Sequence, residues 1–120
     1  MDNYHLVRPE HLNHHGTLFG GQLLSWVDEC AWMAAASEFP GYSFVTRAMD
    51  KIEFNHPVNN GSILRFNSTI KKVGKSSITY LVEVLEGNQK QGNETLAFST
   101  TVTFVSVDSN GNKREIISIC

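Results

Sequence analysis

The sequence has few cysteines, no apolar run at its N-terminus and little excess charge. Its two cysteines, Cys30 and Cys120, do not make the disulfide framework of a small secreted domain. The opening residues, MDNYHLVRPEH, lack the apolar segment of a secretory signal, so we expect a cytoplasmic protein. The formal net charge of −2 gives no indication of nucleic acid or a membrane as a partner.

Metal-site spacing is also lacking. His11, His14 and His15 cluster, but no second group of cysteines and histidines follows them. Metal sites need ligands at defined spacing, so the sequence predicts no metal ion. Internal repeats and low-complexity tracts are missing as well, and a length of 120 residues predicts a single domain over residues 1–120.

The segment from Asn13 to Phe39 begins as a polar loop with glycines and continues as a long apolar helix. No Pro or Gly interrupts residues 22–39, and Pro40-Gly41 ends the run, which predicts a helix over about 20–39. Apolar residues fall on most faces of this helix, so we expect it to be buried by a curved sheet and, where the sheet cannot cover it, by a second subunit.

Asp28 lies near the middle of this helix. An unpaired buried carboxylate is costly, so Asp28 should be paired, protonated or facing a cleft. One interpretation is that Asp28 belongs to a structural network of polar contacts, and the other is that it takes part in catalysis. Gly21 shares its helix face, about 10 Å away along the axis. If both serve one reaction, they come from different subunits, which predicts an active site at a dimer interface.

Beyond Gly41 the hydrophobic period changes to two. Strands are predicted over 43–54, 62–73, 77–86 and 95–107, with a short extended piece near Tyr4–Val7. The side chains expected to face inward are Phe44, Thr46, Ala48, Ile52, Phe54, Leu64, Phe66, Ser68, Ile70, Ile78, Tyr80, Val82, Val84, Leu96, Phe98, Val102 and Phe104. A lone helix followed by antiparallel strands predicts an α+β fold with the helix on one face of the sheet.

The loop and the helix together carry a motif. It reads Asn13-His14-His15-Gly16-Thr17-Leu18-Phe19-Gly20-Gly21, with Asp28 fifteen residues after Asn13. Further matches follow at Val45-Thr46, at 54–58 and at 72–78. Over residues 13–107 the chain therefore resembles the hotdog-fold acyl-CoA thioesterases. The resemblance implies an antiparallel sheet wrapped around one long central helix, in dimers that often build up to tetramers or hexamers.

The resemblance also implies catalytic roles. Asp28 matches the catalytic acid, and Asn13 matches a polar partner from the facing subunit. Gly20 and Gly21 match the amides that hold the thioester oxygen. Such amides suit a tetrahedral oxyanion, and the acid would act as general base on a water or attack the carbonyl directly. For Asn13 the alternative is a loop asparagine that caps a turn.

Substrate contacts are implied at further positions. The segment that meets the nucleotide end of coenzyme A corresponds to the turn with Lys72, Gly74, Lys75, Ser76 and Ser77. Gly16, Thr46 and His56 complete the expected substrate-binding set, with His56 standing where relatives often carry arginine. No cofactor is implied, because coenzyme A is part of the substrate.

The sequence therefore leads to an acyl-CoA hydrolase that releases a free acid and coenzyme A. One alternative is a non-catalytic acyl-CoA-binding sensor of the same fold, although the retained Asp28 argues against it. Another is a hydratase or dehydratase. Those enzymes rely on a histidine in a different loop-helix motif, and His14 and His15 precede the glycines here.

Overall fold

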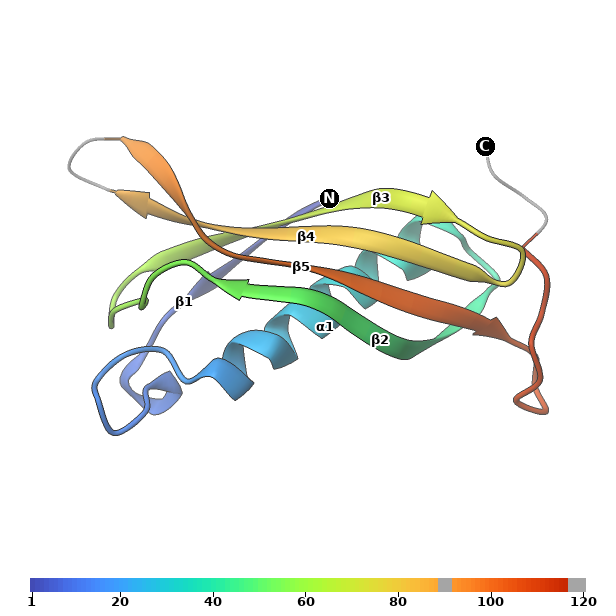
Figure 1. Ribbon diagram of the computed structural model, residues 1–120, viewed down its shortest axis with the longest axis horizontal. Coiled ribbons are helices and arrows are strands. Elements are labelled where there is room, and N and C mark those ends of the chain that lie inside the picture. The colour runs from blue at the N-terminus through green and yellow to red at the C-terminus, as the bar shows by residue number, and fades with distance from the viewer. Residues whose placement is uncertain (89–91, 117–120) are drawn as a thin grey trace.

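In the computed structural model, which describes residues 1–88 and 92–116, one long helix lies along a single sheet (Figure 1). Cys120 lies outside the described residues. The elements in chain order are β1 (Asp2–Leu6), the 3-10 helix η1 (Pro9–His11), α1 (Gly20–Glu38), β2 (Ser43–Phe54), β3 (Ile63–Val73), β4 (Ser77–Asn88) and β5 (Asn93–Val107). The predicted α+β hotdog architecture is confirmed. Within the described part of the chain, no helix is long and apolar enough to cross a bilayer.

The sheet is antiparallel throughout, with the strand order β1-β3-β4-β5-β2. β1 and β2 therefore form its two edges. The bounds predicted for β2 are those observed, and β4 and β5 each extend two residues further into their connection than predicted. The extended piece expected near Tyr4–Val7 is β1, which pairs with the first half of β3.

The core lies between α1 and the facing side of the sheet. The apolar and aromatic sheet residues with no exposed surface are Leu64, Phe66, Ile78, Tyr80, Val82, Val84, Phe98, Val102 and Phe104. The helix contributes Leu23, Trp26, Val27, Cys30, Ala31, Ala34 and Ala35. These helical positions recur every three or four residues and so form one stripe, and each large side chain buried there contributes about 1.5–3 kcal/mol.

The opposite side of α1 is not covered by the sheet. Trp32 is 45% exposed, and Ser25 and Glu29 are exposed as well. In the single chain the sheet therefore covers only one side of the helix, and the rest of the expected burial would have to come from a second subunit. The helix is left with an uncovered side that includes an indole ring.

Strict alternation fails at the register shifts and at the sheet margins. Leu96 is 37% exposed and Ala97 is buried, the reverse of the prediction, because β4 and β5 change register beside them. β2 changes register twice, and Ile52 is exposed although it was predicted to face inward. Phe54 is 56% exposed at the end of the strand, but its ring packs against Phe98, with 4.8 Å between centroids, on the helix-facing side as predicted. Ile70 is 44% exposed because the pairing of β1 with β3 ends at Asn67.

The inner face of β1 meets the first half of α1 through a histidine. The ring of His5 stacks on Trp26, with 4.5 Å between ring centroids, and meets the edge of Phe66 at 5.3 Å. Burial lowers the pKa of His5 below its usual value. Glu29 opposes this shift, and His11 adds to it.

We expect this histidine to make folding stability depend on pH. The unfolded chain, with a histidine pKa of about 6.5, takes up a proton before the folded protein does, so stability is lost as pH falls below that value. His5→Phe keeps a ring against Trp26 but does not titrate. Its urea midpoint should therefore fall less than the parent's between about pH 7 and 5. Equal declines in the two proteins would contradict this assignment.

Candidate active site

Asp28 is held by an edge strand. Thr46 Oγ1 donates a hydrogen bond of 2.7 Å to Asp28 Oδ1. A register shift separates Thr46 from Ala48 on β2, and bulges of this kind re-aim side chains beside functional sites. Sequence reasoning assigned Thr46 to substrate binding and missed this contact, although it placed Thr46 on the helix-facing side of the strand.

The carboxylate of Asp28 has no ionic partner in the described part of the chain. The ion pairs there join His56 to Glu86 and Arg65 to Asp2 and Glu94. Asp28 is half-buried and lies beside the uncovered side of α1. One turn later Trp32 Nε1 donates to the Phe44 carbonyl at 3.2 Å, which fixes α1 against β2. A neutral hydroxyl and a firm backbone thus orient a carboxylate that stays partly open to solvent.

The start of α1 presents unpaired backbone donors. Phe19 is the N-cap residue and supplies no side-chain acceptor, and the first turn holds no acidic residue. The first amides of a helix have no partner within it, and the helix dipole makes this end attractive to negative charge. A Cβ on Gly21 would lie 2.6 Å from the Phe19 ring, so glycine there lets that ring lie against the helix backbone.

The side chain of Asn13 is engaged within its own loop. Its Oδ1 accepts from the backbone N–H of His15 at 2.8 Å and of Thr17 at 3.3 Å, and its Nδ2 donates to Thr17 Oγ1 at 3.2 Å. This is the turn-capping geometry that sequence reasoning left open as the alternative. Gly16 occupies the same turn with a φ of 81°, a left-handed conformation that favours glycine.

The expected site residues do not gather at one place in one chain. The start of α1 lies at the end of the sheet where β2 finishes, since a Cβ on Gly20 would lie 3.6 Å from the Phe54 ring. His56 is at that end too, with its Nε2 2.8 Å from Glu86 Oε1. Ser77 lies at the opposite end of β4 from Glu86, about 30 Å away at the usual rise of a strand. In Figure 1 the two ends are at the left and the right.

The turn between β3 and β4 is closely braced. Gly74 N–H donates to the Ser77 carbonyl at 2.7 Å, and a Cβ on Gly74 would lie 2.7 Å from Ser77 Oγ. The Ser76 carbonyl accepts from the Ser106 amide at 2.8 Å. Glycine is therefore required here for close approach, and the turn has a defined shape before any ligand binds.

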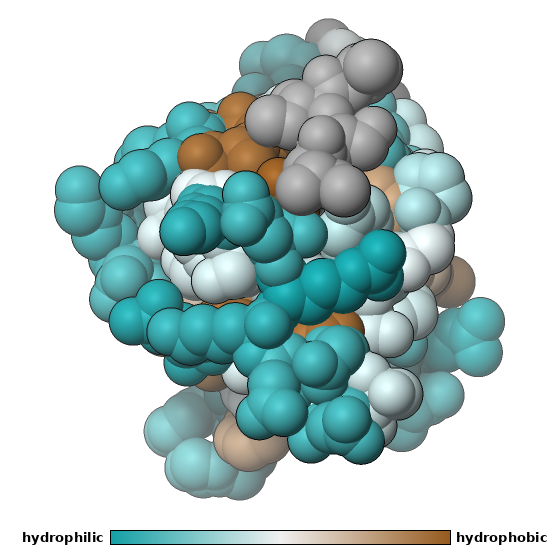
Figure 2. Space-filling view, turned by 90° about the vertical axis from the view of Figure 1, so that its right-hand side faces the viewer, coloured by the Kyte–Doolittle hydropathy of each residue, from teal (hydrophilic) through white to brown (hydrophobic). Residues whose placement is uncertain are grey.

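Lys72 and Lys75 are exposed beside this turn. Figure 2 looks onto the end of the molecule where β3 meets β4, and hydrophilic side chains cover much of it. Ammonium groups and hydroxyls on a pre-shaped turn suit phosphate oxygens.

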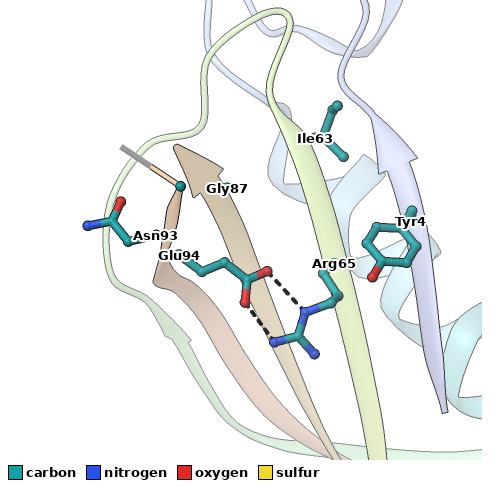
Figure 3. A pocket seen from close by; sticks show the side chains of 7 residues that line it. Tyr4, Ile63, Arg65, Gly87, Asn93 and Glu94 are labelled. Atoms are coloured by element: carbon teal, nitrogen blue, oxygen red, sulfur yellow. Dashed lines mark hydrogen bonds and ion pairs between the residues drawn. The ribbon is translucent and has the colours of Figure 1, made fainter. Parts of the chain in front are cut away.

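A pocket of about 370 Å³ opens elsewhere, on the sheet face turned away from α1 (Figure 3). Its lining residues are Tyr4, Ile63, Arg65, Gly87, Gly92, Asn93 and Glu94. Arg65 donates to both carboxylate oxygens of Glu94, at 3.0 and 2.8 Å. This pairing raises the pKa of Arg65 and lowers the pKa of Glu94. The Arg65 guanidinium is thus already paired with a carboxylate. None of the expected site residues lines this pocket.

Metal coordination has no support in the residues that the structure describes. Among them, no group of three or more His, Cys, Asp or Glu side chains could hold an ion. The rings of His14 and His15 lie 3.9 Å apart, whereas the ring of His11 packs against Trp26.

Comparison with known sequences shows that the chain is similar to thioesterases. Residues 15–93 match the thioesterase superfamily. YkhA of Bacillus subtilis, an uncharacterized acyl-CoA thioester hydrolase, is 36% identical over 105 residues, which are 88% of this chain and 60% of that protein. Rat acetyl-coenzyme A thioesterase is 32% identical over 84 residues, which are 70% of this chain and 15% of that protein. The chain thus spans less than two thirds of the length of these relatives.

Solved structures show the same fold. An acyl-CoA hydrolase from Staphylococcus aureus, in complex with butyryl coenzyme A, coenzyme A and coenzyme A disulfide, superposes with a TM-score of 0.92 at 28% identity. The match covers 100% of this chain and 73% of that one. A hexameric thioesterase from Yersinia pestis superposes with a TM-score of 0.88 at 31% identity, covering 97% of this chain and 93% of that one.

The left-handed turn in the loop before α1 predicts a stability cost for substitution at Gly16. Gly16→Ala should lose about 1–2 kcal/mol of unfolding free energy, because a Cβ strains that conformation. Gly16→Asn should lose less, since asparagine tolerates it better. Urea unfolding of the three proteins measures the difference, and an alanine variant as stable as the parent would show that the turn does not need glycine.

Proposed function

The chain belongs to the thioesterase superfamily, and from that membership we propose that it hydrolyses acyl-CoA thioesters to a free acid and coenzyme A. The observation that carries the proposal is the Asp28 carboxylate. It is oriented by the Thr46 hydroxyl at 2.7 Å and is not neutralised by an ion pair within the described residues. A carboxylate that is oriented by a neutral donor and stays partly open to solvent is suited to act on a bound substrate.

The solved relatives support these residue roles. Structures of the Staphylococcus aureus hydrolase exist with an aspartate, a threonine or an asparagine replaced by alanine. The asparagine lies fifteen residues before the aspartate in that enzyme, the same spacing as Asn13 and Asp28 here. The threonine lies seventeen residues after the aspartate in that enzyme, and Thr46 lies eighteen after Asp28 here, so the residue type matches and the spacing differs by one.

In the proposed reaction, attack on the thioester carbonyl forms a tetrahedral oxyanion. The amides of Gly20 and Gly21, at the positive end of the helix dipole, stabilise that charge, and losing one such donor typically costs about 3–4 kcal/mol. Asp28 either takes the proton of the attacking water or attacks the carbonyl itself. Asn13 orients the water or the carbonyl. The thiolate of coenzyme A is the leaving group.

One complete site needs two subunits. Asp28 and Gly21 lie about 10 Å apart along one helix, too far to meet a single carbonyl carbon. The uncovered side of α1 and the exposed edge strand β2 offer a surface for a second copy. A two-fold partner laid along this surface would bring its glycine end toward Asp28. We therefore propose a homodimer, which can assemble further as in hexameric relatives.

The substrate's coenzyme A would lie along the braced turn. Lys72 and Lys75 supply charge for its phosphates, and Ser76 and Ser77 supply hydroxyl donors beside Gly74. Gly16, Thr46 and His56 remain candidates for contacts nearer the acyl group. His56 would approach from the other subunit, because it lies at the glycine end of its own chain.

Replacing Asp28 tests the chemistry. We expect Asp28→Ala to reduce the rate of acyl-CoA hydrolysis by about 10²–10⁴-fold while the protein still folds. The matched control is Glu83→Gln, which changes an acid on the sheet face turned away from α1 and should stay within about twofold of the parent. Thiol release from a panel of acyl-CoAs measures the rate. Equal turnover by Asp28→Ala and the parent would exclude the mechanism, and tight binding without release would favour the sensor function.

Mixed oligomers test the shared site. Asp28→Ala and Asn13→Ala should each be inactive alone. Co-expressed, they should recover roughly a quarter of parental activity, because half of the random dimers carry one site with both residues intact. Each variant co-expressed with itself is the control. Failure of the mixed protein to recover activity would place both residues in the same subunit's site.

A further inference from the structure

One residue outside the expected site contacts three parts of the unit that carries Asn13 and the helix glycines. The rings of His11 and Trp26 form a T-shaped pair, with 4.7 Å between centroids and an interplanar angle of 80°. His11 Nδ1 accepts a hydrogen bond of 3.0 Å from the backbone N–H of Arg8. The His11 carbonyl accepts one of 2.9 Å from the N–H of Phe19.

The carbonyl contact closes the base of the active-site loop. Phe19 directly precedes Gly20, and the next pair inward is the bridge between Leu12 and Leu18. Above it, Asn13 N–H donates to the Thr17 carbonyl at 2.8 Å. The two sides of the loop are therefore paired with each other from His11 and Phe19 inward. One side leads to Asn13, and the other leads to the first amides of α1.

The ring contact joins this paired loop to the body of α1. Trp26 is 8% exposed and is also stacked by His5 at 4.5 Å, so the indole is held in one place. Trp26 lies two residues before Asp28 on the same helix. The His11 ring thus ties the short helix η1 to a rigid part of α1 rather than to mobile surface.

The hydrogen bond accepted by His11 Nδ1 is the third contact. It links the last residue of η1 back to Arg8, the residue before that helix begins, and so holds the turn closed. Phenylalanine could pack on Trp26 but could not accept this hydrogen bond, and asparagine could accept it but has no ring. Histidine supplies both in one side chain.

We propose that His11 is a positioning residue for the reaction, which sets Asn13 and the Gly20 and Gly21 amides in register with each other. This inference rests on the proposed thioesterase function. His11 itself touches neither substrate nor reacting atoms. It acts through the loop that it closes, and misplacement of oriented groups by even 1 Å can cost about 10²-fold in rate.

The test compares three substitutions with one control. His11→Ala removes both side-chain contacts, His11→Phe keeps the ring, and His11→Asn keeps an acceptor. The control is His14→Ala, which removes an exposed histidine of the same loop whose ring pairs with the ring of His15. kcat and KM for an acyl-CoA that the parent hydrolyses are measured well below the melting temperature of every variant.

We expect His11→Ala to lower kcat at least about tenfold with KM changed less than about threefold, because positioned groups are lost and not binding area. His11→Phe and His11→Asn should each restore part of that loss. His14→Ala should remain near the parent. A merely structural role would lower the melting temperature of His11→Ala and leave kcat unchanged, which would overturn the proposal. An equal loss in His14→Ala would overturn it as well.

A second readout does not depend on activity. Hydrogen exchange of the Phe19 amide, which donates to the His11 carbonyl, should be faster in His11→Ala than in the parent and unchanged in His14→Ala. Unchanged exchange in His11→Ala would contradict the proposed connection. If the parent hydrolyses no acyl-CoA, the proposed function fails, whereas faster exchange at Phe19 would still support the closing role of His11.

Discussion

The hydrogen bond from Thr46 to Asp28 is the interaction on which this account depends. It joins the middle of the only long helix in the described chain to an edge strand, and it orients a carboxylate with a neutral donor that leaves the negative charge intact. The same place lacks cover from its own sheet, with Trp32 45% exposed nearby. The carboxylate proposed to react and the uncovered side of the helix therefore lie at one place, as the proposed interface between subunits requires.

The fold of one chain keeps the proposed oxyanion-binding amides apart from the proposed catalytic acid. A straight helix carries its N-terminal amides and its central acid on one face, about 10 Å apart, so no single chain can close them on one carbonyl. The turn between β3 and β4 and the loop before α1 lie at opposite ends of the sheet (Figure 1). A two-fold pair of copies, as proposed, would bring the glycine end of one chain to Asp28 of the other.

The sequence predicted the fold best in strands where buried and exposed residues alternate strictly. On the central strand β4 every residue expected to face inward, such as Val82, is fully buried. Prediction failed at Leu96, where a register shift changes the face without a signal in the residue pattern. Trp32 shows that apolar character on a helix does not reveal which chain covers it. The hydrogen bond between Thr46 and Asp28 was missed because these residues lie eighteen positions apart, with a register shift directly after Thr46. Hydrophobic periodicity carries no information on such a contact.

The most direct measurement is a crystal structure of the parent protein with a non-hydrolysable ketone analogue of butyryl-CoA, in which a methylene group replaces the thioester sulfur and the carbonyl is kept. The account predicts that the carbonyl oxygen accepts hydrogen bonds from the Gly20 or Gly21 amide of one subunit. The Asp28 carboxylate facing that carbonyl carbon should belong to the other subunit and should still bond to Thr46. A carbonyl bound wholly within one subunit, or lying far from Asp28, would contradict it.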